Sequence, residues 1–98
     1  MIKHSVIFKL KHSPDSAETT NFWNAAKKLS NISGVRNFEC LKQTSPKNRF
    51  EYGLSMEFDD QKAYDFYSNH SEHVHFIQQF WVKDVEDFLE IDYEKFVE

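Results

Sequence analysis

The chain has 98 residues, a formal net charge of −4, 16% aromatic residues and a single cysteine. This length fits one domain spanning residues 1–98, and its scattered Lys and Arg disfavour nucleic-acid binding, which usually requires a clustered basic face. We expect a cytoplasmic protein without membrane contact, because the chain opens on an alternating pattern rather than a signal peptide and no apolar run could span a bilayer.

The first predicted element is a strand at residues 2–11, where apolar and polar side chains alternate. His4 has the same parity as Val6 and Phe8, so we expect its imidazole on the buried face of the sheet. A helix is predicted at about residues 15–30, since Pro14 suits a first helical turn. Its buried side is predicted from apolar residues at helical spacing: Phe22, Ala25, Ala26 and Leu29.

Two more strands are predicted at residues 35–44 and 50–58, joined by a polar turn as an antiparallel hairpin. Strict alternation in the second of them predicts one apolar face: Phe50, Tyr52, Leu54, Met56 and Phe58. A helical region follows Asp59 and Asp60, and Ser71 begins a fresh turn within it. The predicted buried face of this region consists of Ala63, Phe66, Tyr67, His70, His73, Phe76, Ile77 and Phe80.

The last predicted strand lies within residues 85–93, where Val85, Leu89 and Ile91 share one face and the acidic residues form a solvated face. The element order is therefore β-α-β-β-α-β. This order predicts an α+β fold with a four-stranded antiparallel sheet and helices on one face.

The richest stretch in chemical groups is residues 64–76, where Tyr67, His70 and His73 follow at intervals of three and can share a helix face. A neutral imidazole suits proton abstraction near pH 7, and a tyrosine hydroxyl can donate to an oxygen that gains charge. We expect His4 to hydrogen-bond Tyr67 or His73, directly or through one water, because an unpaired buried imidazole costs about 1–3 kcal/mol. The alternative is that these side chains are only core residues.

A metal site is a weaker hypothesis. His4, His70, His73 and His75 are zinc-type ligands, but His73 and His75 are two apart and point to different sides of a helix. No CxxC or HExxH motif supports the set. We therefore predict no metal and no cofactor.

These residues together resemble a known family, the stress-responsive A/B barrel domain (Dabb). The resemblance extends to about Tyr93, and its motifs are residues 2–11, Ile32-Ser33-Gly34-Val35, Tyr67-x-x-His70-x-x-His73 and Ile91-Asp92-Tyr93. It implies a ferredoxin-like fold and a homodimer in which two sheets meet face to face as a dimeric α+β barrel.

The resemblance also implies a site. Most members have no established activity, but one plant member is a polyketide cyclase that closes a ring by aldol condensation. Its functional positions match His4, Tyr67 and His73, which we predict as catalytic residues of a pocket for a small apolar or polyketide-like molecule. The alternatives are a non-catalytic ligand-binding or dimer-scaffold domain and, by fold analogy, a haem-type monooxygenase.

Overall fold

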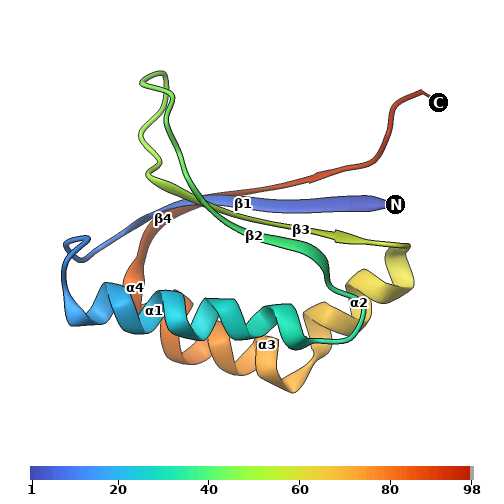
Figure 1. Ribbon diagram of the computed structural model, residues 1–98, viewed down its shortest axis with the longest axis horizontal. Coiled ribbons are helices and arrows are strands. Elements are labelled where there is room, and N and C mark those ends of the chain that lie inside the picture. The colour runs from blue at the N-terminus through green and yellow to red at the C-terminus, as the bar shows by residue number, and fades with distance from the viewer. Residues whose placement is uncertain (98) are drawn as a thin grey trace.

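The computed structural model describes residues 1–97 and shows a four-stranded antiparallel sheet with the helices on one side (Figure 1). The strands lie in the order β2-β3-β1-β4. The elements are β1 (Ile2–Leu10), α1 (Ala17–Lys27), the 3₁₀ turn η1 (Lys28–Asn31), β2 (Arg36–Lys42), β3 (Tyr52–Phe58), α2 (Gln61–Asn69), α3 (Ser71–Phe76), the π-helical turn η2 (Ile77–Trp81), α4 (Val82–Asp84) and β4 (Val85–Tyr93). The predicted ferredoxin-like α+β class is confirmed. In residues 1–97, every helix is too short or too polar to cross a membrane.

The core lies between the sheet and the helices and is built mainly of rings. Phe8 is fully buried, and its ring centroid lies 5.6 Å from that of Phe22 in α1 and 5.0 Å from that of Trp81 in η2. β1 and β3 pair directly, so their inward side chains form one apolar surface: Val6, Phe8, Leu10, Leu54, Met56 and Phe58. The inner faces predicted for these two strands are therefore correct.

The first helix begins later than predicted. Ser16 is its N-cap, and the Ser16 hydroxyl accepts a hydrogen bond from the backbone N–H of Thr19 at 3.2 Å. The cap satisfies one of the N–H groups that a helix start leaves unpaired. Pro14 lies in the preceding turn, which the N–H of Ser16 closes on the carbonyl of Ser13 at 3.0 Å.

The second helical region bends at His70. This residue has an extended backbone, with φ −66° and ψ 138°, and ends α2. Its Nδ1 accepts a hydrogen bond from the N–H of Glu72 at 3.1 Å, so the imidazole caps α3. The two short helices therefore meet at a corner, which positions the side chains of Tyr67 and His73 relative to each other.

The face that α2 presents to the sheet differs from the prediction. Phe66 is 53% exposed and its ring lies against that of the half-buried His70. Tyr64 instead turns inward, with its ring parallel to that of Phe58 at 5.0 Å and its hydroxyl 2.8 Å from Nδ1 of His4. Tyr64 offers both an apolar ring and a hydroxyl for a buried polar neighbour, so the helix rotates to bury it rather than Phe66.

β4 has the predicted bounds but a different facing. A bulge between Lys9 and Leu10 shifts its register against β1, so Val85 pairs with Leu10 while later residues change face. The inward positions pair Phe88 with Phe8, Glu90 with Val6 and Asp92 with His4. Glu90 and Asp92 therefore lie on the same sheet face as His4, although their side chains stay 54% and 41% exposed, as the prediction of a solvated acidic face requires.

The outer face of the sheet, away from the helices, exposes apolar side chains. Leu89 is 49% exposed and Tyr93 is 54% exposed. The apolar members of this face are Ile7, Leu41, Leu89, Ile91 and Tyr93. Contiguous apolar surface of this kind usually marks an interaction site.

Candidate functional site

A cavity of about 220 Å³ lies between the inner face of the sheet and the helices α2, α3 and η2. Most of its wall is apolar: Val6, Leu29, Leu54, Met56, Phe76, Ile77, Trp81 and Phe88. Polar groups enter it from β1, α2, α3 and β4: His4, Tyr64, Tyr67, Ser68, His73 and Glu90. The sheet and the helices thus bring titratable groups to one apolar space, as binding pockets commonly do.

His4 lies on the central strand β1 and is 7% exposed, as its strand parity predicted. Its Nδ1 lies 2.5 Å from Oδ1 of Asp92. Because a carboxylate only accepts hydrogen bonds, this pairing selects, for the neutral imidazole, the tautomer with the proton on Nδ1 and the lone pair on Nε2. In residues 1–97, Nε2 of His4 has no protein hydrogen bond. Every fully buried side-chain nitrogen there has a partner, so Nε2 is not fully buried and is accessible from the cavity that His4 lines.

Tyr67 comes from α2 and is 3% exposed. Within the part of the chain that the structure describes, its hydroxyl has no protein hydrogen-bond partner, and part of the hydroxyl surface remains accessible. The hydroxyl therefore reaches the cavity. Burial raises the pKa of Tyr67, with a smaller contribution from the charge of Glu90, so the phenol keeps its proton and can act as a donor.

His73 comes from α3, and its ring centroid lies 4.5 Å from that of Tyr67. Nδ1 of His73 lies 3.0 Å from the carbonyl oxygen of Ser68. A carbonyl accepts only, so Nδ1 carries the proton and Nε2 holds the lone pair. Burial lowers the pKa of His73. The imidazole is therefore neutral at pH 7 and can accept a proton.

The predicted site residues line the same cavity, but the direct partners of His4 are not the predicted ones. The ring centroids of His4 and Tyr67 lie 6.3 Å apart, and the direct partners of His4 are Asp92 and Tyr64. The prediction of a direct bond from His4 to Tyr67 or His73 is therefore wrong, whereas a bond through one water stays a prediction. His4 and Tyr67 both line the cavity, so a ligand there reaches both side chains.

Three residues of the site were not found in the sequence: Tyr64, Glu90 and Asp92. The Tyr64 hydroxyl lies 2.9 Å from Oδ2 of Asp92 and 3.3 Å from Oε1 of Glu90. Burial and these carboxylates raise the pKa of Tyr64, so this phenol is also protonated. The alternation Phe88-x-Glu90-x-Asp92 was the available signal in the sequence. The sheet face on which these residues lie depends on the bulge that sets the β1–β4 register.

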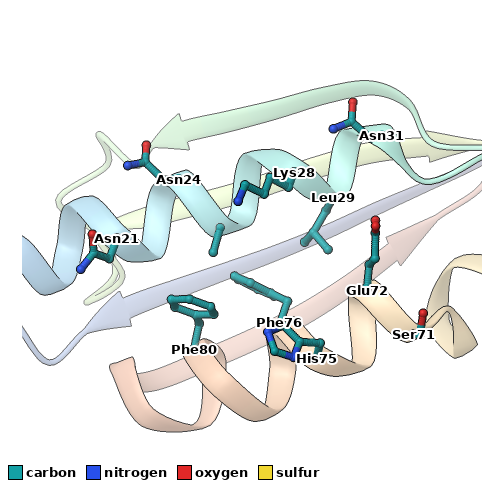
Figure 2. Close-up of a pocket in the computed structure, with 11 residues that line it drawn as sticks. Asn21, Asn24, Lys28, Leu29, Asn31, Ser71, Glu72, His75, Phe76 and Phe80 are labelled. Carbon is teal, nitrogen blue, oxygen red and sulfur yellow. The ribbon is translucent and has the colours of Figure 1, made fainter.

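A larger groove of about 900 Å³ lies on the outer side of the helical layer, between α1 and α3 (Figure 2). Leu29 and Phe76 point towards one another across its floor and also line the inner cavity, so they separate the two spaces. His75 borders the groove, whereas His73 faces the inner cavity. His73 and His75 therefore lie on different sides of α3, as their spacing predicted.

As the pH is lowered beneath about 6.5, the ordinary pKa of histidine, we expect the free energy of unfolding to decrease. The decrease should be steeper in the wild type than in His73→Gln. Between this value and the lowered pKa of folded His73, the unfolded chain binds more protons than the folded chain, so stability rises with pH. Urea unfolding at roughly pH 5 and pH 7.5 measures the difference. Equal pH slopes for both proteins would contradict the assigned burial of His73.

This topology and this cavity define a ferredoxin-like α+β domain with a largely apolar pocket, into which a few polar groups project, between sheet and helices. The chain belongs to the stress responsive A/B barrel domain family (Dabb), whose family model matches residues 2–95. Comparison with curated proteins gives no match.

Solved structures agree with this assignment. A Dabb family protein with a ferredoxin-like fold from Mesorhizobium loti is 49% identical, with a TM-score of 0.93 and coverage of 98% of this chain and 97% of that one. A dimeric ferredoxin-like protein of unknown function from Bacteroides fragilis is 28% identical, with a TM-score of 0.71 and coverage of 96% and 95%. A hydroxynitrile lyase from Passiflora edulis is 14% identical, with a TM-score of 0.80 and coverage of 94% and 90%, which shows a shared fold.

Proposed function

We propose that this Dabb domain binds a small carbonyl compound in its inner cavity and removes a proton from the carbon next to the carbonyl, as a cyclase or lyase does. The observation that carries the proposal is the Tyr67 hydroxyl: its side chain is buried, but the hydroxyl has no protein partner in residues 1–97 and reaches the cavity beside two imidazoles. In a largely apolar cavity, such a donor favours a ligand or water that accepts its hydrogen bond.

Each group has a distinct role in this chemistry. Nε2 of His73 takes the proton from carbon, and the electron pair moves onto the carbonyl oxygen. The Tyr67 hydroxyl donates to that oxygen and stabilises its developing charge. His4, oriented by Asp92, offers a second lone pair for moving a proton on the opposite wall of the cavity. The carbanion then attacks a second carbonyl in a cyclase or expels a leaving group in a lyase.

The cavity volume supports a small ligand. About 220 Å³ is below the range of roughly 300–1,000 Å³ for typical drug-sized pockets. This size favours a compact, largely apolar molecule over a haem, so a haem-type monooxygenase is the less supported alternative. A non-catalytic ligand-binding domain is the principal rival, because the same cavity would serve binding alone.

Proton exchange at carbon in D₂O, followed by NMR with small β-diketones, tests the proposal. We expect the wild type to accelerate exchange above buffer and His4→Phe to lose the acceleration while staying folded. Folding should survive because Asp92 and Glu90, which lose their partner, are 41% and 54% exposed and remain hydrated. The matched control is His75→Phe, in the outer groove, which should keep the wild-type rate.

Two outcomes separate the rival functions. Ligands that raise the melting temperature without any accelerated exchange would show a binding domain rather than an enzyme. Equal loss of exchange in His4→Phe and His75→Phe would disconnect the activity from the inner cavity.

The proposal includes a homodimer formed through the outer face of the sheet. Ile7 lies near the middle of this face and is surrounded by the exposed Leu41 and Leu89. Related structures from Bacteroides fragilis, Thermobifida fusca and Jannaschia are described as dimeric, which supports this arrangement.

Sedimentation equilibrium at micromolar concentration is expected to give twice the mass of one chain. Ile7→Asp should shift the protein towards monomer, because it places a charge in an apolar interface. Val82→Asp is the matched control, since Val82 is 67% exposed on the helical side. A monomeric wild type, or equal behaviour of both variants, would contradict the face-to-face dimer.

A further inference from the structure

Four polar side chains converge where β1, β4 and α2 meet: His4, Tyr64, Glu90 and Asp92. Nδ1 of His4 lies 2.5 Å from Asp92 and 3.8 Å from Glu90. One ligand atom from each of His4, Glu90 and Asp92 fits within a mutual separation of 4.8 Å. The imidazole is buried, whereas the side chains of Glu90 and Asp92 are 54% and 41% exposed, so the cluster joins a buried nitrogen to two solvent-accessible carboxylates.

The two carboxylates lack the cationic partners that their neighbours have. Earlier in the same strand, Glu86 pairs with Lys9 at 3.6 Å and Asp87 pairs with Arg49 at 2.6 Å. Among residues 1–97, the basic group within 4.0 Å of Glu90 or Asp92 is the imidazole of His4 alone. A concentration of negative charge beside a buried nitrogen attracts a cation.

The available protons do not satisfy these acceptors either. The Tyr64 hydroxyl lies within 3.3 Å of His4, Asp92 and Glu90, but it has only one proton to donate. Nδ1 of His4 supplies at most one more. Some carboxylate lone pairs therefore accept no hydrogen bond from these groups. Glu90 and Tyr64 also line the cavity, so the cluster borders it.

A second observation points to a ligand at the same place. Tyr67 is 3% exposed, its hydroxyl has no protein partner in the described residues, and the residue lines the cavity together with His4 and Glu90. It could hydrogen-bond a water or a ligand atom held at the carboxylate cluster.

We propose that His4, Asp92 and Glu90 bind one divalent transition-metal cation of the Zn²⁺ type, through Nδ1 and two carboxylate oxygens. An imidazole nitrogen and carboxylate oxygens are both zinc ligands, and three of them leave the fourth tetrahedral position open for a water. Zinc–ligand distances of about 2.0–2.2 Å hold neighbouring ligand atoms roughly 3–4 Å apart. The His4–Glu90 separation of 3.8 Å already satisfies this spacing, whereas His4 and Asp92 must separate.

Binding requires the other tautomer of His4. The proton leaves Nδ1 for solvent and a solvent proton binds Nε2, so the imidazole stays neutral while the freed lone pair of Nδ1 forms the bond to the metal. Nε2 then donates into the cavity instead of accepting. Metal occupancy and a base role for Nε2 of His4 are therefore mutually exclusive. This inference goes beyond the proposed function and does not depend on it.

Isothermal titration of the full-length chain with Zn²⁺ tests the site. We expect one saturable site per chain, with a binding heat that does not depend on the ionisation enthalpy of the buffer, because the imidazole of His4 keeps one proton. Glu90→Gln should weaken binding at least about tenfold, and Asp92→Asn at least as much. The control Glu86→Gln, on the same strand, should bind as the wild type does.

Two ligand variants are compared so that misfolding of one still leaves a test of the site. Glu90 is exposed, so Glu90→Gln is expected to fold even where Asp92→Asn does not, and thermal unfolding verifies both. Absence of saturable binding to the wild type overturns the proposal. Binding that survives Glu90→Gln and is lost in His70→Ala or His75→Ala also overturns it, because the metal would then sit on the helical histidines. None of these results depends on an enzymatic activity.

Discussion

Tyr67→Phe is expected to lower the rate of the proposed proton exchange by about 10²–10³-fold, the loss typical of removing one donor to a developing oxyanion. The change deletes a hydroxyl that has no protein partner in residues 1–97, so it leaves the packing of the ring intact. The ring still lies 5.2 Å from Phe58 and 4.5 Å from His73 between centroids. NMR-detected exchange with small β-diketones gives the rate, and thermal shift gives the ligand affinity.

The matched control is Tyr52→Phe, whose ring packs against Trp23 at 5.3 Å and lies outside the cavity lining. This variant should exchange at the wild-type rate. A Tyr67→Phe protein with full exchange activity would remove the oxyanion role. A parallel loss of ligand affinity and rate would instead assign the hydroxyl to ground-state binding.

Phe8→Ala is expected to lower the free energy of unfolding by about 3–5 kcal/mol, the usual range for truncating a buried Phe. Phe8 is fully buried at the centre of the aromatic core. Its ring contacts Phe22, Trp23, Tyr52 and Trp81 at centroid distances of 5.6, 5.7, 5.9 and 5.0 Å. Urea unfolding monitored by circular dichroism measures the loss.

Phe66→Ala is the control for this measurement. Phe66 is 53% exposed on α2, and surface substitutions usually change stability by less than about 0.5 kcal/mol. A large loss for Phe66→Ala would support the helix facing that the sequence pattern predicted. A loss below about 1 kcal/mol for Phe8→Ala would contradict the core described above.

The sequence predicted the fold well where one physical signal dominated. In β1 and β3, strict alternation specified which side chains face the helices, and the structure buries Val6, Phe8 and Met56 accordingly. In β4 the alternation was misread, because a bulge against β1 changes the facing after Val85. A bulge belongs to a pair of strands, so one strand's pattern does not reveal it.

The site was predicted in part for the same reason. The cavity contains His4, Tyr67 and His73, whose positions follow from local patterns and from the family resemblance. Their catalytic roles stay a prediction. Tyr64 was missed because its inward rotation depends on polar partners from β1 and β4, which are 60 and 28 residues away in sequence.

The corner at His70 has an evolutionary consequence. His4 and its acidic partners are held by paired strands, whereas Tyr67 and His73 are carried by two short helices that meet at His70. Insertions or substitutions at this corner would change the distance between the donor and the two imidazoles without disturbing strand pairing. A lineage could therefore acquire new substrates by remodelling a few corner residues while inheriting the sheet half of the site unchanged.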